Sequence, residues 1–204
     1  MKLDTRASAI VLAIVVLLAV VAVVVIVSTV DVSSTGLRVN DDRVSQQTID
    51  DELASFSKGR FFQQSYEQQG ETFKTTRGAV NSIAAAQWLS FRLQTALGQQ
   101  LLAREGVKVT ERNIDAARRA LRRQNLFVGM SSRAANVLSE FQATDTKLAS
   151  TFPQGSERTA ALTRAARRAH ITIDTRYGKW NRRLLSVCPP SGCRRRVPII
   201  QSGQ

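Results

Sequence analysis

Few residues of this chain could act as a nucleophile, a general base or a metal ligand. Its 204 residues include one histidine, His170, and two cysteines, Cys188 and Cys193. One histidine excludes most Ser/His and Cys/His catalytic sets, and these three residues cannot supply the four protein ligands of a zinc module. The sequence also contains no phosphate-binding glycine loop. We therefore predict no catalytic residues, metal ligands or cofactor, and expect His170 to be a solvated or capping residue.

The acidic residues near the start of the polar region have two interpretations. Asp41 and Asp42 are followed by a second cluster, Asp50, Asp51 and Glu52. Together they would suit a cation. More simply, the first pair belongs to a turn and the second cluster to the positive end of a helix, and we favour this interpretation.

Cys188 and Cys193 flank the sequence Pro-Pro-Ser-Gly. The prolines and the glycine favour a tight bend that brings the two sulfur atoms together. Outside the cytosol such a pair is more often a disulfide than two thiols. The alternatives are two unpaired cysteines or, less well supported, a redox pair, although the spacing is not Cys-x-x-Cys.

An uncharged apolar run, Ala7–Val27, indicates where the chain would meet a membrane. A helix over this run rises about 31 Å, close to the thickness of a bilayer's hydrocarbon core. We predict a cytoplasmic tail (1–6), a transmembrane signal-anchor helix (7–30) and a linker (31–36). Lys2 and Arg6 precede the run, and positively charged flanks usually stay in the cytoplasm. We therefore expect the chain to cross the plasma membrane once, with residues 31–204 on the extracytoplasmic side. A cleaved signal peptide remains the alternative.

The net charge of +13 is concentrated toward the C-terminus. Residues 157–196 contain eleven Lys or Arg residues against two Asp or Glu residues. In a cytosolic protein this would suggest nucleic acid. With the predicted topology, anionic lipid headgroups or cell-envelope polymers are better partners, no nucleic acid is expected, and a solvated face is the plain alternative.

Periodicity predicts short strands near both ends of the exported region and helices between them. Runs 37–39 and 43–45 flank an Asn-Asp-Asp turn, and His170–Asp174 alternates again. A lone strand cannot satisfy its hydrogen bonds, so we expect the terminal strands to pair. Helices are expected from Ser45 or Thr48, over 78–105, from Thr110, over 132–149 and over 156–169. The predicted fold is mainly α with a small β-sheet that joins the two ends.

Three segments together resemble the SurA-like, or parvulin-associated, extracytoplasmic chaperones. Val39-Asn40-Asp41-Asp42-Arg43-Val44-Ser45 is similar to the family's entry motif, with Asp41 in place of the usual glycine. Leu101–Thr110 is similar to the family's helix, glycine stop and next capped helix. Ile171–Trp180 resembles the closing strand, with Thr175 where proline is usual. The chain has no segment that would supply the prolyl-isomerase domain.

The resemblance implies a helical chaperone domain over residues 37–180, related to the client-binding region of trigger factor, and a basic tail over 181–204. It implies a non-enzymatic, membrane-anchored protein of the bacterial cell envelope that binds unfolded or newly exported polypeptides. Apolar side chains at helix ends and connectors are the candidates for client contact, although core burial is the alternative for each: Phe61, Phe62, Tyr66, Phe127 and Met130. A scaffold protein that docks a partner or an anionic envelope polymer through its basic C-terminal region is the alternative function.

Overall fold

The computed structural model describes residues 34–193, and those from Thr35 onward belong to one compact unit. The expected membrane segment (7–30) lies outside the described residues, as do the last eleven residues. No helix within 34–193 is both long and apolar enough to cross a bilayer. In chain order the elements are β1 (Thr35–Val39), β2 (Asp42–Ser45), α2 (Gln46–Phe56), α3 (Arg60–Gln68), α4 (Ser82–Arg104), α5 (Glu111–Arg123), α6 (Ser132–Thr151), α7 (Gly155–Arg168), β3 (Ile171–Ile173), β4 (Lys179–Asn181) and β5 (Ser186–Cys188).

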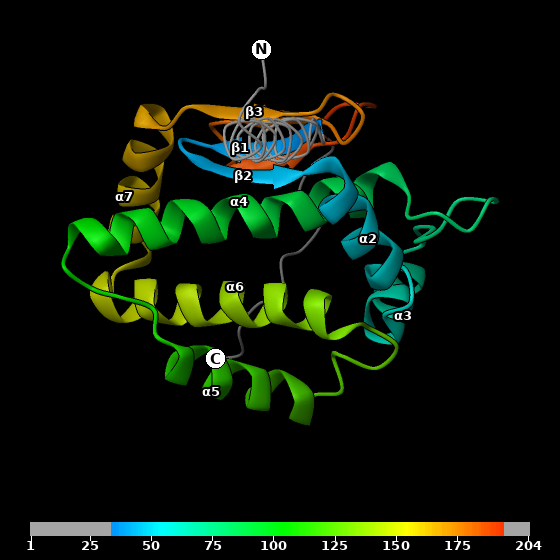
Figure 1. Ribbon diagram of the computed structural model, residues 1–204, viewed down its shortest axis with the longest axis horizontal. Coiled ribbons are helices and arrows are strands. Elements are labelled where there is room, and N and C mark those ends of the chain that lie inside the picture. Colours follow the sequence, from blue (N-terminus) through cyan, green and yellow to red (C-terminus); the bar gives the residue numbers. More distant parts are fainter. Residues whose placement is uncertain (1–33, 194–204) are drawn as a thin grey trace, which may run out of the picture. The chain divides into compact units, whose positions relative to one another are not determined.

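The first and last parts of the unit meet in a three-stranded antiparallel sheet with the order β2-β1-β3 (Figure 1). Leu37 is opposite Ile173 and Val39 is opposite Ile171. Asn40 makes the β1–β2 turn with a φ of 56°, a left-handed conformation that asparagine tolerates. The predicted pairing of the terminal strands is therefore confirmed, and it closes the helical region between them.

Side-chain caps explain where three of the helices begin. Ser45 accepts a hydrogen bond from the Thr48 amide (3.1 Å) at the start of α2, and Ser131 accepts one from the Ala134 amide at the start of α6. The long helix α4 begins at Ser82 rather than at the predicted position 78. Asn81 caps it by accepting from the Ala84 amide at 2.8 Å, whereas Gly78 lies in a preceding turn with a φ of 79°.

Helix α3 was not predicted, because its sequence reads as a polar, glutamine-rich stretch after an aromatic cluster. Its buried side chains are Phe62 and Tyr66, four residues apart and so on one face of the helix. Two apolar positions in nine residues give too little periodic signal to identify a helix.

Helix α4 forms the centre of the core, with Trp88, Leu89 and Leu93 fully buried. Helix α6 packs closely against it where Gly98 faces Thr144: a Cβ at Gly98 would lie 2.7 Å from the Thr144 methyl carbon. Helix α5 is the outermost helix and packs on the other side of α6 (Figure 1). Helix α7 then leads back to β3.

A second, two-stranded sheet of β4 and β5 also packs on α4. The Val187 amide donates to the Ser90 hydroxyl (2.9 Å), and the Gln94 side chain donates to the Leu185 carbonyl (2.8 Å). The expected boundary between a domain ending at 180 and a tail beginning at 181 falls inside β4, so the chain belongs to the folded unit at least as far as Cys188. The hairpin was missed because its strands have only three residues each.

Candidate functional site

The structure separates the five candidate client-contact residues into two groups. Phe62 and Tyr66 are only 2% and 3% exposed, so their assignment to an open binding surface is wrong for this structure. Phe62 packs against Phe56 with ring centroids 4.7 Å apart, and the Tyr66 hydroxyl donates to the side-chain oxygen of Gln87 at 2.5 Å. Phe61 is exposed, whereas Phe127 and Met130 are half-buried.

The other three candidates lie at one corner of the unit, together with Val128. We call Phe61, Phe127, Val128 and Met130 the apolar corner. The Arg60 amide donates to the Val128 carbonyl at 3.1 Å, which joins the first turn of α3 to the α5–α6 loop. Among the described residues, the exposed large hydrophobic side chains are Phe61 (38%), Val128 (42%) and Leu184 (50%), so two of the three lie at this corner.

Gly129 allows the α5–α6 loop to lie this close to the end of α2. Its φ is 89°, and a Cβ there would lie 2.1 Å from the Lys58 carbonyl oxygen. The Ser131 amide also donates to the Ser55 hydroxyl at 2.7 Å. Backbone groups of the α5–α6 loop therefore hold the corner against the chain that joins α2 to α3.

A buried carboxylate, which the sequence analysis missed, joins two of the helices. Glu52 is 0% exposed, and its Oε2 atom accepts from both the Trp88 indole N–H (3.0 Å) and the Arg92 Nε–H (3.0 Å), while Arg92 Nη2 donates to Oε1. Helical spacing contained the signal, because Glu52 shares a face with the buried Ile49 and Phe56. Glu52 therefore has a structural role rather than a role at the helix end.

Glu140 on α6 faces the same group of charges. Burial raises the pKa of its carboxyl group above the ordinary value, and the nearby Glu111 and Glu52 raise it further. Arg92 and Arg118 oppose this effect. The charges that act on Glu140 come from α2, α4 and α5.

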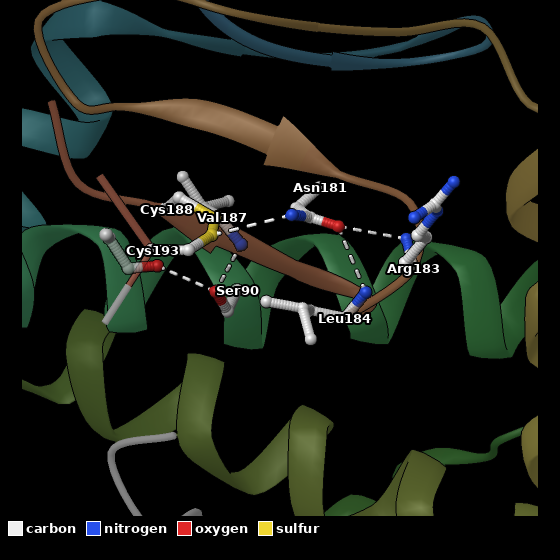
Figure 2. The surroundings of a disulfide bond; sticks show 8 residues. Ser90, Asn181, Arg183, Leu184, Val187, Cys188 and Cys193 are labelled. Atoms are coloured by element: carbon white, nitrogen blue, oxygen red, sulfur yellow. Dashed lines mark hydrogen bonds between the residues drawn. A yellow bond between two sulfur atoms is a disulfide. The ribbon is translucent and has the colours of Figure 1, made fainter. Parts of the chain in front are cut away.

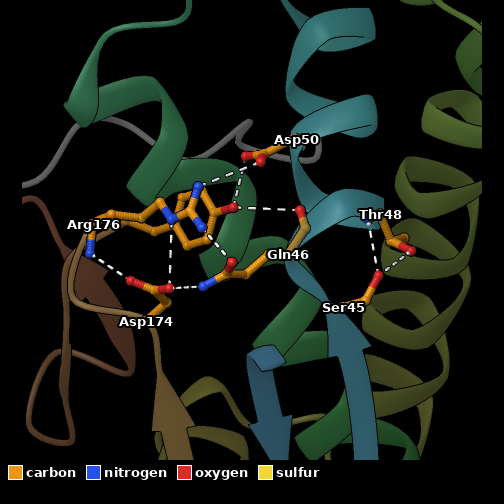
Figure 3. A network of polar contacts seen from close by, with 7 residues as sticks. Ser45, Gln46, Thr48, Asp50, Asp174 and Arg176 are labelled. Atoms are coloured by element: carbon orange, nitrogen blue, oxygen red, sulfur yellow. Dashed lines mark hydrogen bonds and ion pairs between the residues drawn. The ribbon is translucent and has the colours of Figure 1, made fainter. Parts of the chain in front are cut away.

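A second polar network ties the β3–β4 connection to the start of α2 (Figure 3). The Tyr177 hydroxyl donates to the Asp50 carboxylate at 2.6 Å, and Arg176 pairs with Asp50 at 3.5 Å. Arg176 and Asp174 also contact the side chain of Gln46. Asp50 thus belongs to a structural contact between the two ends of the unit. Asp41 lies in the β1–β2 turn, as predicted, whereas Asp42 is the first residue of β2.

Cys188 and Cys193 form a disulfide with their Cα atoms 4.7 Å apart, as the sequence predicted (Figure 2). Cys188 is buried at the end of β5, and the Asn181 side chain on β4 approaches the Cys193 sulfur at 3.6 Å. The bond closes the loop that follows the hairpin. Because Cys188 lies in β5, which packs on α4, we assign the disulfide a structural role.

The remaining candidate residues, His170 and the acidic side chains, do not come together in a metal-binding cluster in the part of the chain that the structure describes. His170 is exposed, and its backbone amide donates to the Asn40 side chain at 2.8 Å. Within residues 34–193, no group of three or more His, Cys, Asp or Glu side chains could hold a metal ion. The exposed features with potential for binding are therefore the apolar corner and the arginine-rich helix faces.

The described residues define a mainly helical domain with two small antiparallel sheets. No protein-family model, curated protein or solved structure matches the chain. The function is therefore inferred from the residues themselves and from their contacts.

Proposed function

We propose that this protein is a non-enzymatic, chaperone-like binder of unfolded or newly exported polypeptides, of the SurA-like class without an isomerase domain. It acts on the extracytoplasmic side of the plasma membrane, to which residues 7–30 anchor it. The observation that carries the proposal is the apolar corner, where Phe61 and Val128 are exposed beside the half-buried Phe127 and Met130.

The chemistry of the corner suits a client of variable sequence. The methionine side chain adapts its shape to different apolar partners, the phenylalanine rings supply apolar area, and a small total area gives weak, reversible binding. Such binding lowers the concentration of aggregation-prone chains without any covalent step. The segments that resemble the family's entry motif and its closing strand pair with each other, Val39 opposite Ile171, and this pairing supports the proposed class.

The test measures how the full chain, held in nanodiscs of neutral lipid, affects the light scattering of an unfolded protein diluted from denaturant. We expect suppression of aggregation at near-stoichiometric ratios. Replacing Phe61 and Val128 together by serine should raise the concentration needed for half-suppression by roughly thirtyfold, because each buried apolar side chain contributes on the order of 1 kcal/mol.

Leu184→Ser is the matched control, since Leu184 is the other large exposed apolar residue in the described part and lies outside the corner. This variant should suppress aggregation as well as the unchanged protein does. Equal loss in the corner variant and in the control would assign the effect to general surface hydrophobicity. No suppression by the unchanged protein would remove the proposed function.

A further inference from the structure

One line of arginine residues follows the outer face of α5. Arg112, Arg119 and Arg123 are exposed and are spaced by seven and four residues. At about 100° per residue they lie within about 40° of one another around the helix axis. The buried residues of α5, Ala117 and Leu121, lie on the opposite side, about 140° or more from Arg112 by the same geometry. We call Arg112, Arg119 and Arg123 the arginine stripe.

The charges of the arginine stripe are not neutralised by the fold. None of the three side chains takes part in the ion pairs found within residues 34–193. The ion pair on α5 joins Arg118 to Asp115, which lies to one side of the stripe. Helix α5 is the outermost helix in Figure 1 and packs on α6. Its outer face therefore presents three guanidinium groups, which have no ion pair with any described residue, along about 16 Å of helix.

We propose that the arginine stripe of α5 docks on the anionic headgroups of a phospholipid bilayer. The positive charge of the stripe requires a negatively charged partner, and guanidinium groups bind phosphate oxygens in a bidentate manner. The sequence favours a bilayer over a soluble polyanion, because the uncharged run Ala7–Val27 precedes the folded unit by a short linker. The inference does not depend on the client binding proposed above.

The experiment follows the distance of α5 from a bilayer in the full chain. Ala116 is exposed on the same side of α5 as the stripe, and both cysteines of the described part are in the disulfide, so an Ala116→Cys variant offers one thiol for a fluorophore. The labelled chain is reconstituted into vesicles that carry a headgroup-attached quencher. The bilayers are zwitterionic lipid alone or zwitterionic lipid mixed with phosphatidylglycerol.

We expect quenching in the phosphatidylglycerol vesicles, little quenching in zwitterionic vesicles, and reversal at high salt. The variant R112Q/R119Q/R123Q should lose the quenching, with docking weakened roughly a hundredfold, because each basic residue near an anionic surface contributes on the order of 1 kcal/mol. The control R164Q/R167Q/R168Q removes the same charge from exposed positions of α7 and should keep the quenching. Circular dichroism checks that both variants fold.

Three results would overturn the proposal. The first is no difference in quenching between anionic and zwitterionic vesicles. The second is an equal loss of quenching in the α5 variant and in the α7 control, which would show that docking depends on the net charge of the protein and not on the stripe. The third is stripe-dependent binding of a single-stranded oligonucleotide without docking on anionic vesicles, which would make the partner a soluble polyanion.

Discussion

The carboxylate of Glu52 accepts a hydrogen bond from the indole N–H of Trp88 at 3.0 Å, and both side chains are fully buried. Arg92, one turn further along α4, donates to the same oxygen atom and is 23% exposed. The contact joins α2 to the central helix through a charge that has no access to water. A buried charge of this kind depends on its partners, because removal of one of them leaves the others unsatisfied.

Glu52→Ala should therefore destabilise the protein by about 3 kcal/mol, because it leaves the indole N–H and the guanidinium group without an acceptor. Urea unfolding followed by circular dichroism measures the change. The neighbouring Asp51 is 59% exposed and pairs with Arg133 at 3.6 Å, so Asp51→Ala is the control and should change stability by less than about 1 kcal/mol. Similar losses in the two variants would contradict the buried contact.

Glu140 should make stability depend on pH. Its pKa is raised in the folded state, so the folded protein binds this proton more tightly than the unfolded chain does. The resulting stabilisation is complete below the unfolded pKa and is lost as the pH rises through the folded pKa. Glu140→Gln should have the higher melting temperature at neutral pH, and this gain should vanish at about pH 4.

Thermal unfolding at several pH values checks the Glu140 prediction. Glu67→Gln is the control, because Glu67 is exposed on α3. A Glu140→Gln variant that melts below the unchanged protein at neutral pH would show that Arg92 and Arg118 outweigh the burial of the carboxylate.

A side chain added at Gly129 should disturb the apolar corner, because Gly129 lies against the Lys58 carbonyl next to it. Gly129→Ala places a methyl group against the Lys58 carbonyl, and we expect a loss of about 2 kcal/mol or more together with weaker client binding. Gly106 also has a positive φ, of 71°, but no atom lies within 4 Å of the position that an added Cβ would take. Gly106→Ala should cost only about 1 kcal/mol and leave client binding unchanged, as measured by urea unfolding and the scattering assay.

The two tyrosines of the chain should resist ionisation while the protein is folded. Burial raises the pKa of both Tyr66 and Tyr177, and the hydrogen bond to Asp50 adds to the effect at Tyr177. Phenolate absorbance should therefore stay low through about pH 10 in the native protein and rise there in urea. The folded state loses stability above that pH, since the unfolded chain releases these protons first. A full native titration at about pH 10 would contradict the burial of both side chains.

Local patterns in the sequence were sufficient for most of the elements. The α2 stripe of Ile49, Leu53 and Phe56, the cap at Ser45 and the pairing of strands near 37–39 and 171–173 were all predicted and are observed. The short elements were not predicted, because a helix such as α3 or a strand such as β4 contains too few periodic positions. The candidate site was predicted only in part: Phe61 is exposed, but its neighbour Phe62 is in the core.

By itself, the sequence determined most of the helices, the cap at Ser45, the disulfide partners and the excess of positive charge, because each of these depends on residues close together in the chain or on composition alone. The tertiary structure decided which aromatic side chains are exposed, that Glu52 is buried with Trp88 and Arg92, and that Arg60 meets Val128. These relationships join residues far apart in the chain. Helical spacing marks the face of Glu52 as a buried one, but it does not specify which helix packs against that face.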